Sequence, residues 1–205
     1  MKILGIDTST PVLSVALIEN QVVIGHVETG ELAGPQLHGE MLASLVAEML
    51  AEHEIHKVAV GLGPGPYTGL RTGIAFAQAV AFAREVEIVG ISSLFALAHG
   101  YWQKGGTQGV AVLDAKRKEI AWQEFNSNEM LAEPVLTHID DIQLLAHKTI
   151  VGPAFITQPS EFVTVVDSSP PNAVDVAMLC AKGFGATISP LYLRTPDVTP
   201  KEPHA

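Results

Sequence analysis

The sequence predicts an α/β protein made of two unequal halves. In the first half, short apolar stretches typical of buried strands alternate with longer stretches that have helical periodicity. The polar, glycine-containing stretch Lys104–Thr107 then indicates a boundary, and strand patterns begin again after it. We therefore expect one α/β subdomain over residues 1–105 and a shorter one over residues 106–205.

The first half is expected to open with three strands, over Lys2–Ile6, Val12–Glu19 and Val22–Glu28. Because their connections are short, we expect an antiparallel meander. The pattern that follows predicts a helix, a strand, a helix, a strand and a helix, over Gln36–His53, Lys57–Gly61, Gly69–Arg84, Glu87–Ile91 and Ser92–Gln103.

The second half starts with two strands, Gly109–Leu113 and Glu119–Asn126, on either side of the charged turn Asp114–Lys118. Beyond them we expect a short helix, two short strands and a helix, over Asp140–Ala146, Thr149–Gly152, Phe162–Val166 and Asn172–Phe184. The tail from Arg194 is rich in proline and polar residues, so it is expected to be loose.

Composition limits the classes of function. Of the 205 residues, 47% are hydrophobic, which predicts a substantial core. The formal net charge of −10 argues against a chain that grips nucleic acid by itself, because phosphate contacts need clustered Lys and Arg. Cys180 is the only cysteine, Asp7 interrupts the N-terminal apolar run before a signal-peptide core could form, and no apolar run approaches the length of a membrane span. We therefore expect a cytoplasmic protein.

The glycine-rich stretch Gly61–Gly73 lies between a predicted strand and a predicted helix, where backbone N–H groups and the helix dipole can bind an anion. The alternative is a tight turn that needs glycine for conformation and close packing. The loop matches neither standard phosphate motif and has no lysine, which favours the turn. Its candidate phosphate-binding residues are Gly63, Gly65, Thr68 and Gly69.

A second candidate lies at the end of the first strand. The carboxylate of Asp7, beside the hydroxyls of Thr8 and Ser9, is of the type that holds a metal–phosphate complex at a strand end. Ordinary turn hydrogen bonds are the alternative. If both strand-end loops face one crevice, the two candidates form a single nucleotide site.

Other catalytic arrangements are absent from the sequence. His53 and His56 lack the spacing of zinc proteases, and the remaining histidines are scattered. No nucleophile elbow surrounds Ser92 and Ser93, and Cys180 sits in an apolar run typical of a core. We therefore expect no catalytic residue, no metal and no cofactor.

The two helices predicted over Gln36–His53 and Gly69–Arg84 have unusually broad apolar surfaces. A well-covered core and a subunit interface explain this pattern equally well. The candidate interface residues are Met41, Leu42, Leu45, Met49, Leu70, Arg71, Ile74, Ala77, Gln78 and Ala81.

Four stretches of the first half resemble the TsaB family, also called YeaZ, in order and spacing: Ile3–Thr10, Gln36–Glu40, Val60–Gly73 and Gly90–Leu94. Asp114–Arg117 and Leu191–Arg194 fit the family more weakly. The resemblance implies an actin-like, hexokinase-like (ASKHA) fold of two RNase H-like halves, the second rudimentary.

The resemblance also implies a function. It implies a non-catalytic subunit required for N6-threonylcarbamoyladenosine at position 37 of tRNA, paired with the catalytic paralogue TsaD and joined by the ATPase TsaE. It further implies self-association through the same helical surface and contact with tRNA only through the complex.

One departure from the catalytic paralogue supports this assignment. Where that paralogue has a metal-binding pair of histidines, alignment places Ser93 and Leu97, and leucine cannot be a ligand. The main alternative is a stand-alone actin-like ATPase, in which Asp7 holds Mg²⁺ and the Gly63–Gly69 loop holds phosphate. A metalloprotease is the least favoured alternative.

Overall fold

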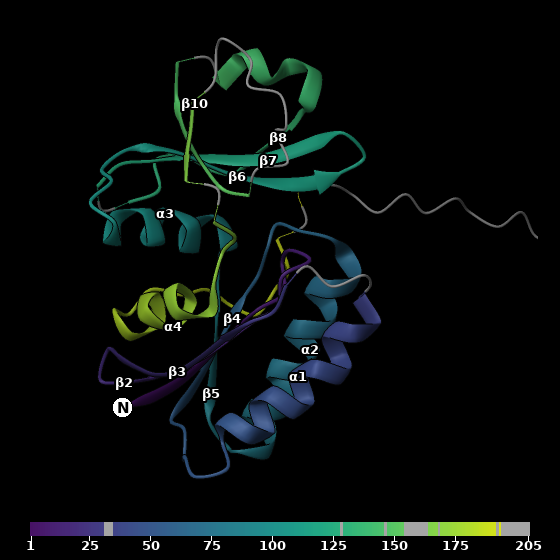
Figure 1. Ribbon diagram of the computed structural model, residues 1–205, viewed down its shortest axis with the longest axis vertical. Coiled ribbons are helices and arrows are strands. Elements are labelled where there is room, and N and C mark those ends of the chain that lie inside the picture. The colour runs from purple at the N-terminus through teal and green to yellow at the C-terminus, as the bar shows by residue number, and fades with distance from the viewer. Residues whose placement is uncertain are drawn as a thin grey trace, which may run out of the picture.

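In the computed structural model, the described residues form two five-stranded sheets that enclose a pair of helices, and two further helices cover the outer face of the first sheet (Figure 1). The structure describes residues 1–30, 35–127, 129–145, 147–153, 164–167, 169–191 and 193. The tail expected to be loose from Arg194 and the expected strand start at Phe162 lie outside the described residues.

The first sheet has the strand order β3-β2-β1-β4-β5. Its strands are β1 (Lys2–Asp7), β2 (Ser14–Glu19), β3 (Val22–Glu28), β4 (Lys57–Gly61) and β5 (Glu87–Ile91). β1, β2 and β3 form the expected antiparallel meander, whereas β4 and β5 run parallel to β1. The apolar run of β1 follows from its central place, because both of its faces are covered.

The second sheet repeats this arrangement. Its strands are β6 (Gly109–Lys116), β7 (Glu119–Phe125), β8 (Val135–His138), β9 (Thr149–Val151) and β10 (Thr164–Asp167), in the order β10-β9-β6-β7-β8. Read from its other edge, the sheet has the same order and directions as the first, with β6 in the place of β1. The predicted fold class, two RNase H-like halves, is confirmed.

Helices α1 (Pro35–Met49) and α2 (Tyr67–Ala83) pack side by side on one face of the first sheet. Helix α4 (Ala173–Ala181) covers the opposite face of that sheet, although it follows the second sheet in the chain. Its approach is so close that a Cβ on Gly5 would overlap with the carbonyl oxygen of Ala173. The central strand therefore carries glycine at this point.

Helix α3 (Ser93–Gln103) shows the opposite arrangement to α4. It precedes the second sheet but packs on it, with Leu94, Leu97 and Ala98 against Ala111 and Leu113. α3 also packs against α4, so the order of layers is first sheet, α4, α3, second sheet (Figure 1). The 3-10 segment η1 (Ile139–Leu145) covers the other face of the second sheet through Leu145.

Most predicted elements are present with shifted ends. The helix expected to reach His53 stops at Met49, and the last predicted helix stops at Ala181 instead of Phe184. β6 runs on to Lys116, because the hairpin turn is tighter than expected. Strand β8 was not predicted. The boundary expected near residue 105 falls between α3 and β6, and as a domain division it stays a prediction.

Candidate functional site

Asp7, the glycine loop and Ser93 come together at one edge of the first sheet. β1, β4 and β5 are parallel neighbours, so their carboxyl ends share that edge. Asp7 ends β1, Gly61 ends β4, and Ser93 follows β5 by two positions. The sequence-based expectation that the two strand-end loops meet is confirmed.

The carboxylate of Asp7 is completely buried and is engaged on both oxygens. Oδ1 accepts hydrogen bonds from Ser9 N at 2.8 Å and from Ser9 Oγ at 2.6 Å. Oδ2 accepts one from Ser93 Oγ at 2.7 Å, and that hydroxyl in turn accepts one from Gly63 N at 3.2 Å. Three donors therefore hold the carboxylate, which has no open side toward solvent.

Burial of the side chain raises the pKa of Asp7 above its ordinary value, although the hydrogen bonds from Ser9 and Ser93 oppose the shift. Desolvation is thus the dominant influence on this carboxyl. Such a group resembles a buried structural acid more than an exposed magnesium ligand, which needs open coordination positions for water and phosphate oxygens.

The glycines of the loop allow it to pack directly against the Asp7–Thr10 turn. A Cβ on Gly61 would overlap with the Asp7 carboxylate, one on Gly65 with the carbonyl oxygen of Ser9, and one on Gly73 with Thr8 Oγ1. These positions require glycine for close approach. We call this assembly of the Asp7–Thr10 turn, the Gly61–Gly73 stretch and Ser93 the strand-end clasp.

Polar groups of the strand-end clasp are largely satisfied within it. Thr8 Oγ1 donates to the Gly69 carbonyl at 2.9 Å, and Ser93 N donates to the Gly63 carbonyl at 2.8 Å. Leu62 N donates to the carbonyl of Ile91. The described residues at the junction of this loop with the β6–β7 hairpin leave a cavity of about 40 Å³. Typical small-molecule sites are roughly 300–1,000 Å³.

The predicted interface residues divide into two groups. Five of them are buried in the core beneath α1 and α2: Leu42, Leu70, Ile74, Ala77 and Ala81. Their side chains pack against the first sheet of their own chain, so we correct the predicted set by leaving these five out of any interface. Met41, Leu45 and Met49 are half-buried, and Arg71 and Gln78 are exposed.

A continuous face of α2 is exposed instead. It consists of Arg71, Ala75, Gln78, Ala79 and Phe82, whose spacing of three and four residues places them on one side of the helix. The Phe82 side chain is 87% exposed, and the Arg71 guanidinium carbon lies 5.5 Å from the centre of the Tyr67 ring. The neighbouring helix α1 exposes Ala43, Ser44, Ala47 and Glu48.

Both the sequence and the two-sheet fold of this chain resemble those of known proteins. Residues 32–154 match the model of the family described as TsaD: tRNA N6-adenosine threonylcarbamoyltransferase. The Escherichia coli tRNA threonylcarbamoyladenosine biosynthesis protein TsaB is 33% identical over 171 residues, covering 80% of this chain and 71% of that protein. The chain belongs to the TsaB family.

Two further relatives extend the likeness over nearly the whole chain. The Haemophilus influenzae TsaB protein is 28% identical over 98% of this chain and 97% of its own length. The structure of YeaZ from Pseudomonas aeruginosa superposes with a TM-score of 0.74, covering 94% of this chain and 99% of that one at 22% identity. That match shows that this TsaB-family chain has the YeaZ fold.

Other sequence candidates lie apart from the clasp of this TsaB-family chain. Leu97 is buried in the core between α3 and the second sheet, four residues beyond Ser93. Cys180 is buried, and burial raises the pKa of its thiol. The described part of the chain holds no group of three or more His, Cys, Asp or Glu placed to bind a metal, and none of its helices could span a membrane.

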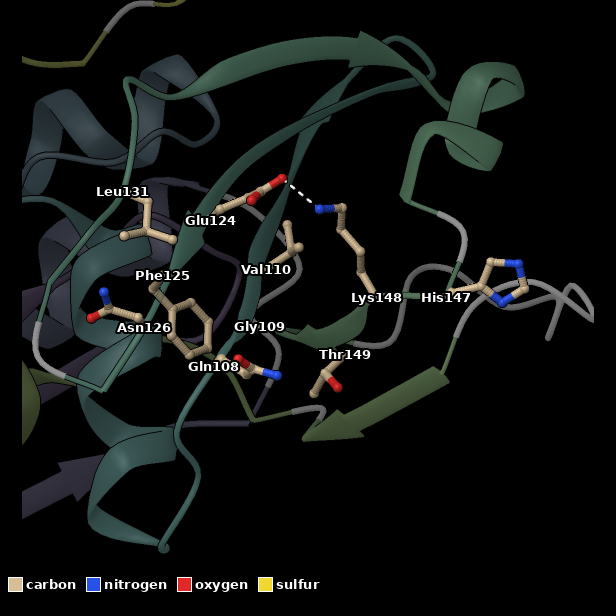
Figure 2. Close-up of a pocket in the computed structure, with 10 residues that line it drawn as sticks. All are labelled: Gln108, Gly109, Val110, Glu124, Phe125, Asn126, Leu131, His147, Lys148 and Thr149. Atoms are coloured by element: carbon tan, nitrogen blue, oxygen red, sulfur yellow. Dashed lines mark hydrogen bonds and ion pairs between the residues drawn. The ribbon is translucent and has the colours of Figure 1, made fainter.

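A polar cavity of the second sheet is not predicted by the sequence. It measures about 280 Å³ and lies over the start of β6, between the end of β7 on one side and the start of β9 on the other (Figure 2). Lys148 Nζ and Glu124 Oε1 form an ion pair of 2.7 Å beside it, and Phe125 and Leu131 supply apolar walls. The two charges neutralise each other, so this cavity shows no preference for an anion or a cation.

Proposed function

We propose that the chain is a non-catalytic subunit required for forming N6-threonylcarbamoyladenosine at position 37 of tRNA. It acts by pairing with a TsaD-like catalytic subunit and by recruiting a TsaE-like ATPase, and it contacts tRNA only through that complex. The pathway is the one that its curated relatives are named for. As an assembly that acts on tRNA, it would work in the cytoplasm.

The main observation in favour of a non-catalytic role is how the Asp7 carboxylate is buried and hydrogen-bonded. Its carboxylate is buried and saturated by Ser9 and Ser93, where a nucleotide enzyme needs an accessible carboxylate. Leu97, the other position aligned with a metal-binding histidine, lies in the core and offers no ligand atom. Both features support a role in binding over one in chemistry.

The exposed face of α1 and α2 supports the choice of docking surface. Ala43, Ala47, Ala75 and Ala79 are small, so a partner helix can approach closely, and Phe82 offers an apolar anchor. Half-buried Met41 and Met49 can repack against different partners. The same face would serve a homodimer, which would then compete with the TsaD-like subunit.

Ala75→Glu tests this placement, because Ala75 is exposed and a charge there leaves the fold intact. Ile74 is unsuitable, since its side chain is buried in the core. We expect Ala75→Glu to weaken co-purification with the catalytic subunit by roughly tenfold or more and to lower tRNA modification in parallel. Ala132→Glu, at an exposed alanine of the second half, is the matched control.

Two failures can be told apart. If Ala75→Glu binds and activates the partner like the unmodified chain, the docking surface lies elsewhere. If the unmodified chain fails to raise modification of tRNA by the catalytic subunit and the ATPase, the activator role itself is wrong.

A further inference from the structure

A second polar cluster lies between α3 and α4, away from the strand-end clasp. The imidazole of His99 is 3% exposed, and its Nδ1 lies 2.6 Å from Oδ1 of Asp175. Its Nε2 lies 2.8 Å from Nζ of Lys182 and 3.3 Å from Nε2 of Gln103. The order carboxylate, imidazole, amine is that of a nucleophile with its base and an orienting acid.

The hydrogen bonds assign the tautomer of His99. The Asp175 carboxylate can only accept, so Nδ1 must carry the proton. Nε2 then carries a lone pair, and both of its neighbours, Lys182 and Gln103, can donate a hydrogen bond to it. A proton on Nε2 would instead point at two donors. In this tautomer the lone pair of Nε2 is directed at the Lys182 amine.

We propose that Lys182 is a nucleophilic modification site that accepts acyl groups from small activated donors, such as acyl phosphates, with His99 as its base. Asp175 is the positioning residue. Its second oxygen, Oδ2, accepts from Asn172 Nδ2 at 2.7 Å, so the carboxylate is fixed on both sides of the imidazole.

Lys182 differs from the other described lysines for which an ion pair is seen, because its hydrogen-bond partner is an imidazole. Lys57, Lys104, Lys116 and Lys148 each bind a carboxylate, which stabilises the ammonium form. A neutral imidazole instead takes up a proton, and the resulting imidazolium is stabilised by the neighbouring carboxylate. Among these lysines, only Lys182 has an amine in contact with an imidazole.

The amine can also be reached by a donor. Lys182 is exposed, and it directly follows α4. The next residue, Gly183, has a positive φ of 87°, and a Cβ placed on it would meet no atom within 4 Å. The base is thus buried while the approach to the nucleophile is open.

The reaction balances without a further reagent. The Lys182 ammonium passes one proton to His99 Nε2, and the free amine attacks the acyl carbon of an acyl phosphate. A C–N bond forms, the bond between that carbon and the phosphate oxygen breaks, and phosphate leaves. The second proton of the amine passes to water, and an amide remains on Nζ.

Acetyl phosphate is the probe. The folded chain is incubated with it, and acetylation of each lysine is followed over time by peptide mass spectrometry. We expect Lys182 to react at least about tenfold faster than Lys104, although the Lys104 side chain is 57% exposed, because general-base catalysis commonly contributes about 10²–10⁴-fold. In His99→Gln the glutamine oxygen still accepts a hydrogen bond but takes no proton, so the rate at Lys182 should fall to that of Lys104.

The dependence of the acetylation rates on pH distinguishes a His99 that acts as a base from a His99 that only holds Lys182 in place. Among the described residues, the titratable groups that contact His99 are Asp175 and Lys182, both contributed by α4 and its end, while Gln103 of α3 is neutral. The ratio of the Lys182 rate to the Lys104 rate should fall once acid protonates His99. Equal rates at the two lysines in the unmodified chain, or a ratio that His99→Gln and pH leave unchanged, would overturn the proposal.

Discussion

Ser93 and Asp7 are 86 positions apart in the chain, yet Ser93 Oγ donates a 2.7 Å hydrogen bond to Asp7 Oδ2. This bond joins the carboxyl ends of β5 and β1 across β4, and the same hydroxyl accepts from Gly63 N of the glycine loop. One small side chain therefore closes the strand-end clasp.

Ser93→Ala should destabilise the fold by roughly 1–3 kcal/mol, because it leaves the buried carboxylate short of a donor and Gly63 N without its acceptor. Urea unfolding at neutral pH measures the change. Ser127→Ala, at an exposed serine, should cost less than about 0.5 kcal/mol. Equal effects of the two substitutions would mean that the clasp contributes nothing to stability.

The clasp should also give stability an unusual dependence on pH. Burial raises the folded-state pKa of Asp7 above its ordinary value of 3.8, so the folded state binds the proton more tightly than the unfolded state. The contribution of Asp7 to the free energy of unfolding therefore decreases as the pH rises from about 3.8 through the folded-state pKa of its carboxyl. Relative to Asp7→Asn, the unmodified chain should lose stability over that window, as urea titrations at several pH values would record.

Asp167 provides a comparison, because its pKa is shifted in the opposite direction. Partial burial acts to raise its pKa, but hydrogen bonds from Lys104 and Ser169 outweigh it and hold the pKa below 3.8. The contribution of Asp167 to the free energy of unfolding is therefore fully present above about pH 3.8. It is lost as the pH falls through the folded-state pKa of this carboxyl. If the stability differences for Asp7→Asn and Asp167→Asn change in the same direction with pH, one of these two assignments is wrong.

Gly73→Ala should be strongly destabilising, because the added methyl group overlaps with Thr8 Oγ1. Thr8→Ala removes that oxygen, so the double variant should be more stable than the sum of the two single changes predicts, by about 0.5–3 kcal/mol. A thermodynamic cycle of urea unfolding measures the coupling. Gly30→Ala, where a methyl group meets no atom within 4 Å, serves as the control.

Two hydrophobic residues of α2 should behave very differently. Leu70 is fully buried, so Leu70→Ala should cost about 2–5 kcal/mol of folding free energy. Phe82 is almost fully exposed, so Phe82→Ala should change stability by less than about 0.5 kcal/mol while weakening partner binding. A large stability loss in Phe82→Ala would show that its ring is covered within the isolated chain.

Sequence reasoning located the central strands well, because strands covered on both faces appear as short, continuous apolar runs. It missed β8, whose four residues form an only partly buried edge strand. That strand is defined by its pairing with β7, which is a tertiary property without a local signal.

The face of α2 was harder to predict for a different reason. Alanine counts as apolar but is also the best helix former, so it is common on exposed helix surfaces. Ala75, Ala79 and Ala83 made the helix look apolar all round, whereas the structure exposes them. At the clasp, parallel strand ends predicted that Asp7 meets the loop, but Ser93 as its third member depends on a contact between distant segments.

The crossing of α4 onto the first sheet bears on how the chain can be synthesised. Ile3, Ile18 and Ala59 lie on the face that α4 covers, and α4 ends at Ala181, after the whole second sheet. While the ribosome is still making the second sheet, that apolar face of the first sheet is bare. The first sheet therefore cannot complete its packing before α4 has emerged from the ribosome, although domains commonly fold one after another during translation.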